Sequence, residues 1–135
     1  MTRPGSSGFR AAVEAGDVPA MRAWLADDVV FRSPVAHKPY AGKAITGAIL
    51  AHVVEVFEDF RYVRELADDD GHALVFEAKV SGLQLTGCDF LVLDGDGLIT
   101  DFMVMVRPLK GAQALAEAMS ARFERIVAMA SEASA

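Results

Sequence analysis

The chain has 135 residues, of which 53% are hydrophobic, and a formal net charge of −6. This length suits one domain, and the acidic balance argues against nucleic-acid binding, which needs a basic face. The single cysteine excludes an internal disulfide and a cysteine-based metal site, and no apolar run reaches the roughly 18 residues of a membrane-spanning helix. The N-terminal segment also lacks the apolar core of a signal peptide, so we expect a cytoplasmic protein that does not enter a membrane.

Hydrophobic periodicity predicts two helices, a short strand, a third helix, four strands and a final helix. Gly16 and Asp17 are typical of a helix end followed by an N-cap, and Asp27 and Asp28 are predicted to end the second helix. The segments 68–71 and 94–97 are rich in Asp and Gly and are typical of turns between strands. In chain order, helices are predicted over 7–15, 18–26, 43–57 and 110–130, and strands over 29–31, 60–66, 72–81, 83–93 and 98–107.

This order of elements predicts an α+β domain. A curved antiparallel sheet is expected to pack on three helices, with one further helix at the C-terminus, and to enclose a cone-shaped cavity. The domain is expected to cover 8–130, with flexible ends at 1–7 and 131–135.

The last predicted strand is apolar on both of its faces. Phe102 and Val104 lie on one face, and Met103 and Met105 lie on the other. The helices of the domain can cover only one face of the sheet, so the second face is expected to pack against another copy of the chain. The sequence therefore predicts a homodimer that forms through the sheet.

The most informative polar residue is Asp89, in the predicted strand 83–93. Strand alternation places it on the same face as Leu85, Leu91 and Leu93. Because burying an ionised acid on an apolar face is costly, Asp89 is expected to stay protonated or to find a partner. A neutral carboxyl inside a cavity can donate a hydrogen bond to a ligand oxygen. The alternative is an acid that bonds to nearby backbone or to an arginine.

Other ionisable residues are weaker candidates for chemistry. His37 lies in a loop near the expected cavity mouth and is either a base at neutral pH or an exposed loop residue. His52 is expected at the boundary of the third helix or pointing inward, and His72 is expected in solvent. Glu77 is expected to form an ion pair across the sheet, or else to be a second cavity acid. Three separated histidines predict no metal site.

Three segments resemble a known family when their order and spacing are taken together. These segments are Phe9–Asp17, Leu25–Pro34 and Asp89–Ile99. They resemble the NTF2-like superfamily and, within it, the SnoaL-like and ketosteroid-isomerase-like branch, and the resemblance covers residues 8–108. It implies the cone-shaped NTF2-like (cystatin-like) fold, a dimer through the convex face of the sheet, and a cavity for small apolar molecules such as steroids, polyketides or terpene epoxides.

The resemblance transfers the catalytic residues of this branch only in part. Asp89 falls where ketosteroid isomerases have a protonated Asp that donates to the substrate oxyanion. The position of the general base there is occupied by Ser33, and that of the second donor, a Tyr, by Phe9. Limonene-epoxide-hydrolase-like members use Asp, Arg and Asp to activate water, and here Gly87 and Val104 stand at the last two positions. Cyclases of the SnoaL type use one acid, so that chemistry stays open.

The sequence therefore predicts a SnoaL-like pocket protein that acts on or binds a small apolar, oxygen-bearing molecule. Asp89 is the candidate acid or oxyanion donor, His37 is the weaker candidate base, and no cofactor or metal is predicted. The alternatives are a ligand-binding protein without catalysis and a dimeric interaction domain. The residues expected to line the pocket are Phe9, Trp24, Phe31, Ser33, Phe57, Asp89, Phe102 and Val104.

Overall fold

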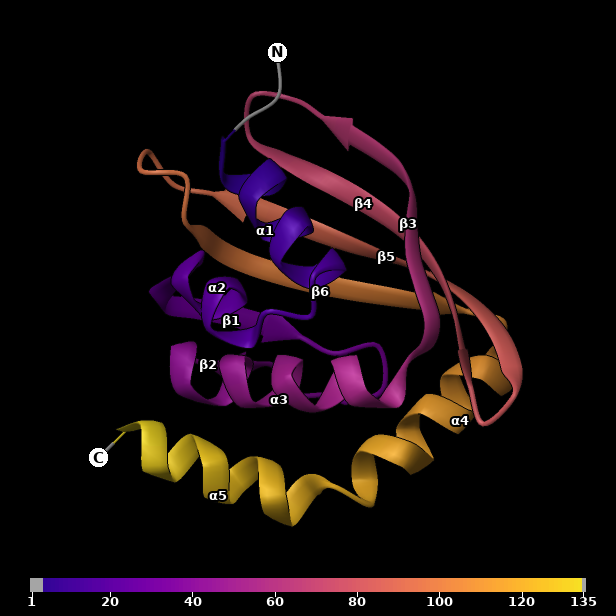
Figure 1. Ribbon diagram of the computed structural model, residues 1–135. Coiled ribbons are helices and arrows are strands. Elements are labelled where there is room, and N and C mark those ends of the chain that lie inside the picture. Colours follow the sequence, from indigo (N-terminus) through magenta and orange to yellow (C-terminus); the bar gives the residue numbers. More distant parts are fainter. Residues whose placement is uncertain (1–3, 135) are drawn as a thin grey trace.

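The computed structural model describes residues 4–134, which form one curved sheet and the helices that pack on it. Figure 1 shows the sheet curving around α1, with α5 alongside α3 and α4 at one end of the long strands. The helices are α1 (Pro4–Glu14), α2 (Val18–Ala23), α3 (Lys43–Val56), α4 (Leu109–Ser120) and α5 (Phe123–Ser134). The strands are β1 (Leu25–Arg32), β2 (Tyr40–Ala41), β3 (Glu58–Ala67), β4 (Gly71–Val80), β5 (Leu83–Leu93) and β6 (Ile99–Arg107).

The sheet has the strand order β2-β1-β6-β5-β4-β3 and is mixed, whereas the sequence predicted an antiparallel sheet. Strand β1 runs parallel to β6, with Leu25 beside Ile99. The backbone N–H of Ile99 donates to the carbonyl of Trp24 at 2.8 Å, so both strands start at the same end of the sheet. The predicted α+β class and the curved sheet (Figure 1) are otherwise confirmed, and the other described strand pairs are antiparallel.

Two predicted helix boundaries are wrong, for reasons that involve burial. Helix α2 ends at Ala23, and Asp27 and Asp28 lie inside strand β1 at a break in its register with β6. That irregularity leaves both acids exposed while their neighbours are buried. The predicted helix 110–130 is divided into α4 and α5, because the chain turns at residues 121–122 to pack α4 against the sheet and α5 against α3.

The local signals around the turns are confirmed. Gly16 has a φ of 66°, which suits glycine, and the side chain of Asp17 caps α2 by accepting from the backbone N–H of Ala20 at 3.2 Å. Asp68 and Asp94 accept hydrogen bonds from backbone N–H groups within their own turns.

Helix α1 already begins at Pro4, and α5 continues to Ser134, so both helices extend into the ranges where the sequence predicted flexible ends. Residues 1–3 and 135 lie outside the described residues. The flexibility of the two ends stays a prediction. No helix within 4–134 is long and apolar enough to cross a membrane, and the cytoplasmic location also stays a prediction.

The concave face of the sheet carries the core. Along β4, Leu74, Phe76 and Ala78 are buried while the residues between them are more exposed. Glu77 lies on the convex face, where its carboxylate accepts from Arg61 of β3 at 2.6 Å. This geometry confirms the predicted cross-strand ion pair and removes Glu77 from the cavity.

Candidate functional site

A cavity of about 480 Å³ lies between the concave face of the sheet and the helices. Most of its wall is apolar and aromatic. Helices α4 and α5 contribute to the wall through residues such as Leu115, Met119 and Ile126, so the C-terminal part of the chain helps to close it. Of the residues expected to line the pocket, the structure places these on the cavity wall: Phe9, Phe31, Ser33, Phe57, Asp89, Phe102 and Val104.

Trp24 is not on this wall, contrary to the expectation from the sequence. It is the C-cap of α2, and its indole ring lies against Gly8 of α1, where a Cβ would overlap it. The prediction assumed that α2 continues past Trp24 with its apolar stripe facing the cavity. Because the chain instead enters strand β1 at Leu25, the side chain packs between the first two helices.

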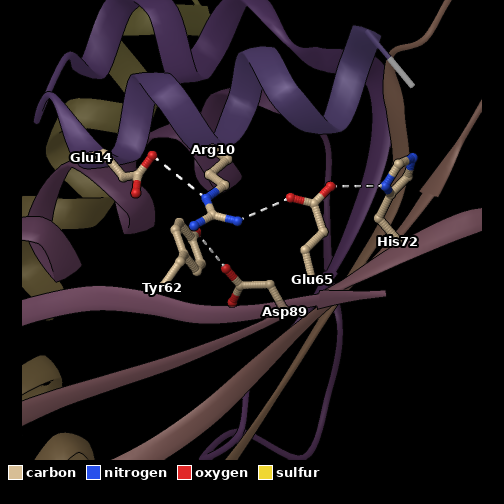
Figure 2. A network of polar contacts seen from close by, with 6 residues as sticks. All are labelled: Arg10, Glu14, Tyr62, Glu65, His72 and Asp89. Atoms are coloured by element: carbon tan, nitrogen blue, oxygen red, sulfur yellow. Dashed lines mark hydrogen bonds and ion pairs between the residues drawn. The ribbon is translucent and has the colours of Figure 1, made fainter. Parts of the chain in front are cut away.

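Asp89 lies on β5 with its carboxyl on the cavity wall and only 7% of its surface exposed. Leu85 and Leu91 are buried on the same face of the strand. The Tyr62 hydroxyl donates to Oδ2 of Asp89 at 2.9 Å (Figure 2). Burial raises the pKa of Asp89 to about 7, against the opposing effect of the Tyr62 hydrogen bond. Asp89 can therefore donate or accept a proton near neutral pH.

Tyr62 is a site residue that the sequence reasoning missed. It lies on β3, is buried, and also lines the cavity. Burial, followed by the Asp89 charge and the hydrogen bond to Asp89, raises the pKa of Tyr62 well above its usual range, so its hydroxyl stays a donor. The alternation of Phe60 and Tyr62 with Arg61 was the available signal, because it places both aromatic rings on the apolar face.

Ser33 lines the main cavity, whereas His37 does not. Ser33 lines the rim of the cavity, and its Oγ accepts from the backbone N–H of Val35 at 3.1 Å. His37 is exposed and lies beside a second, more open hollow, which Ser33, Met103 and Met105 also border. The structure therefore does not place His37 next to Asp89.

The positions taken by Arg and the second acid in epoxide-hydrolase-like members are apolar and packed. Gly87 lies beneath the ring of Phe76, and a Cβ at this position would overlap that ring. Val104 pairs with Asp89 across β5 and β6 and lines the cavity. The cavity thus offers no second carboxyl at this place to cooperate with Asp89.

Glu14, in the last turn of α1, is another carboxylate on the cavity wall. Its side chain is 48% exposed and lies 3.5 Å from Nε of Arg10. Glu14 is therefore a residue of the cavity mouth, in contact with water, while Asp89 is the buried acid.

The two remaining histidines are buried, contrary to the expectation for His72. Nδ1 of His72 lies 3.5 Å from Oε2 of Glu65, and the His72 side chain has no exposed surface. His52 also points inward, with Nδ1 3.3 Å from Nη1 of Arg122. Among the described residues, no group of three or more His, Cys, Asp or Glu is placed to hold a metal ion.

Comparisons with known proteins agree with this architecture. The model of the SnoaL-like domain family matches residues 7–102. An uncharacterized protein with a cystatin-like fold from Silicibacter pomeroyi is 37% identical with a TM-score of 0.89, over 95% of this chain and 93% of the other. A structure described as a steroid delta-isomerase from Pseudomonas aeruginosa is 43% identical with a TM-score of 0.86, over 92% of both chains.

A more distant structure supports the fold alone. An NTF2-like protein of unknown function from Cytophaga hutchinsonii is 19% identical with a TM-score of 0.63, over 80% of this chain and 91% of the other. No curated protein matches the sequence.

Proposed function

Because the chain belongs to the SnoaL-like domain family, and because its buried acid faces an apolar cavity, we propose that it binds a small, mostly apolar molecule through one oxygen atom. Protonated Asp89 is the donor to that oxygen. The observation that carries the proposal is the Tyr62–Asp89 pair on an otherwise largely apolar cavity wall.

The chemistry of a neutral carboxyl supports this role. In a site without water, a carboxyl that keeps its proton is a strong donor to a carbonyl or phenol oxygen. The hydroxyl of Tyr62 donates to Asp89, and hydrogen bonds in such a chain strengthen one another. The cavity volume of about 480 Å³ is within the usual range for small-molecule sites, so a compact molecule of two to four fused rings suits it.

Proton transfer is a second candidate function, favoured by the pKa of Asp89 near 7. A general acid or base is most effective when its pKa is close to the working pH. The 43% identical Pseudomonas structure is described as a steroid delta-isomerase, and this similarity favours isomerisation of a ketone as the proton-transfer reaction. Ser33 and Phe9 stand where ketosteroid isomerases have a base and a Tyr, so Asp89 is the residue proposed to move the proton.

Binding is tested by titrating the protein with 2-naphthol and following naphthol fluorescence. We expect saturable binding that weakens as the pH rises through about 7, because ionised Asp89 no longer donates. Asp89→Leu should lose roughly tenfold in affinity, the value of one hydrogen bond, while Asp89→Asn should bind through its amide. Asp101→Asn, on the neighbouring strand, is the matched control and should bind like the natural protein. The absence of saturable binding of phenols and ketones would indicate a cavity filled by side chains.

Proton transfer is tested with 2-decalone in D₂O, by following deuterium uptake at the carbons next to the carbonyl. The natural protein should accelerate uptake over buffer, whereas Asp89→Asn should not, because an amide cannot accept the proton. Equal rates of deuterium uptake with the natural protein and Asp89→Asn would exclude Asp89 as the base for this class of ketone. Ligand binding would then be the proposed function.

A further inference from the structure

We propose that Arg10 is a positioning residue for the Tyr62–Asp89 pair, holding the Tyr62 ring in place and polarising its hydroxyl toward the cavity acid. Arg10 lies on α1, directly after the cavity residue Phe9. Its guanidinium carbon is 5.5 Å from the centre of the Tyr62 ring, within the range of a cation–π contact. This inference rests on the proposed role of Asp89 and concerns how that role is controlled.

The position of Arg10 depends on an irregularity in strand β3. Tyr62 pairs with Phe76, but Arg64 pairs with Val75, so the register shifts by one residue between Tyr62 and Arg64. Without this bulge, alternation would put Tyr62 and Glu65 on opposite faces of the sheet. With the bulge, Glu65 pairs with Leu74, whose side chain is buried on the concave face. The bulge therefore turns a carboxylate inward, toward α1.

Glu65 and Glu14 fix the guanidinium from two sides, as Figure 2 shows. Nη1 of Arg10 lies 3.2 Å from Oε1 of Glu65, and its Nε lies 3.5 Å from Glu14. The other carboxylate oxygen of Glu65 faces the buried ring of His72. A cation with carboxylates on two sides has little freedom to leave the Tyr62 ring, so the ring also has a defined position.

The charge of Arg10 acts on the proton of Asp89 through Tyr62. Burial, the Asp89 charge and the hydrogen bond to Asp89 raise the pKa of Tyr62, and Arg10 opposes that rise. A nearby cation makes a phenol a stronger donor, and a stronger donor stabilises the ionised form of the carboxyl that accepts from it. Without Arg10, Tyr62 should donate more weakly and Asp89 should hold its proton to a higher pH.

The charged and titratable groups around the Tyr62–Asp89 pair come from several elements. Arg10 and Glu14 face it from α1, Glu65 from β3 and His72 from β4, while Cys88 precedes Asp89 on β5. Arg10 is the cation among these described side chains that contacts the Tyr62 ring. The test therefore changes Arg10 and leaves the pair itself intact.

The experiment is a carboxyl-carbon NMR titration of Asp89 in the full chain without ligand. In Arg10→Met, which keeps the apolar part of the side chain, the Asp89 midpoint should rise by about half a pH unit or more. Arg10→Lys keeps the charge without the planar fork and should fall between Arg10→Met and the natural protein. Arg61→Met is the matched control, since Arg61 lies on β3 next to Tyr62 but pairs with Glu77 on the convex face of the sheet. Its Asp89 midpoint should be unchanged.

An unchanged Asp89 midpoint in Arg10→Met, with an unchanged chemical shift of the Tyr62 ring, would overturn the proposal. If Arg10→Met does not fold, Arg10→Gln gives the same decision, because it removes the positive charge, keeps a polar side chain for Glu65 and should raise the Asp89 midpoint in the same direction. These titrations need no ligand. A natural protein that binds no phenol or ketone but still shows the Arg10 effect would therefore contradict the proposed function alone.

Discussion

The Tyr62 hydroxyl donates to Oδ2 of Asp89 across an intervening strand, since β4 lies between β3 and β5 in the sheet. The two residues are 27 positions apart in sequence and two strands apart in space. Their contact requires the inward curve of the sheet that Figure 1 shows. Phe76 of β4 pairs with Tyr62 on one side and with Gly87 on the other, so its ring lies next to the pair.

Gly87→Ala should destabilise the fold, because the new Cβ would overlap the ring of Phe76. Overpacking of this kind costs about 1–3 kcal/mol in the free energy of unfolding, which urea denaturation measures. Gly95→Ala is the matched control, since a Cβ there meets nothing within 4 Å, and it should leave stability nearly unchanged. Equal stabilities of the two variants would mean that Phe76 moves aside without cost.

Asp89→Asn should flatten the pH dependence of stability. The folded protein binds the Asp89 proton more tightly than the unfolded chain does, because the pKa of Asp89 in the folded protein is about 7 against an ordinary value of 3.8. This contribution to stability is present below about pH 4 and is lost as the pH rises through about 7, a change of roughly 4 kcal/mol at most. Urea unfolding at several pH values should show the natural protein losing this stability relative to Asp89→Asn. Parallel curves for the two proteins would mean that Asp89 titrates as an ordinary carboxyl.

His52 should have the opposite pH dependence. Burial lowers the pKa of His52, with Arg122 and Arg125 acting in the same direction and Glu55 against it. The folded protein therefore binds this proton less tightly than the unfolded chain does, and stability falls as the pH drops through about 6.5. His52→Gln should lose less stability than the natural protein between pH 7 and pH 5.

The pH effects of Asp89 and His52 overlap. The contribution of His52 is therefore measured as the difference in the free energy of unfolding between His52→Gln and the natural protein at each pH. His37→Gln is the control, because His37 is exposed in its loop. If His52→Gln follows the natural protein at every pH, protonation of His52 does not oppose folding.

The homodimer stays a prediction, and the convex face of the sheet supports it. Phe90, Val92 and Met105 are exposed on this face, with 53% of Met105 accessible. Met105→Lys should weaken association, measured by sedimentation velocity at micromolar concentration, because it places a charge in an apolar interface. Leu109→Lys, at an exposed position of α4, should not change association. A natural protein that sediments as a monomer would contradict the dimer.

Patterns within single elements were sufficient to locate the cavity acid. The two-residue period of β5 placed Asp89 on the buried face, and Gly16 and Asp17 marked the boundary between α1 and α2. These features depend on neighbours in the chain, which the sequence contains directly. Trp24 shows the limit of this reasoning, because its predicted direction depended on where α2 ends.

The composition of the site was decided by contacts between elements. Alternation determines which face a residue occupies, but it does not determine which strands become neighbours or how strongly the sheet curves. The Tyr62–Asp89 bond depends on that curvature, and the inward turn of Glu65 depends on a bulge that one sequence does not reveal. The sequence alone therefore identified Asp89 as the cavity acid. Its partner Tyr62, and the Arg10 that contacts Tyr62, were determined by long-range packing, because the separation of two residues along the chain does not determine their distance in space.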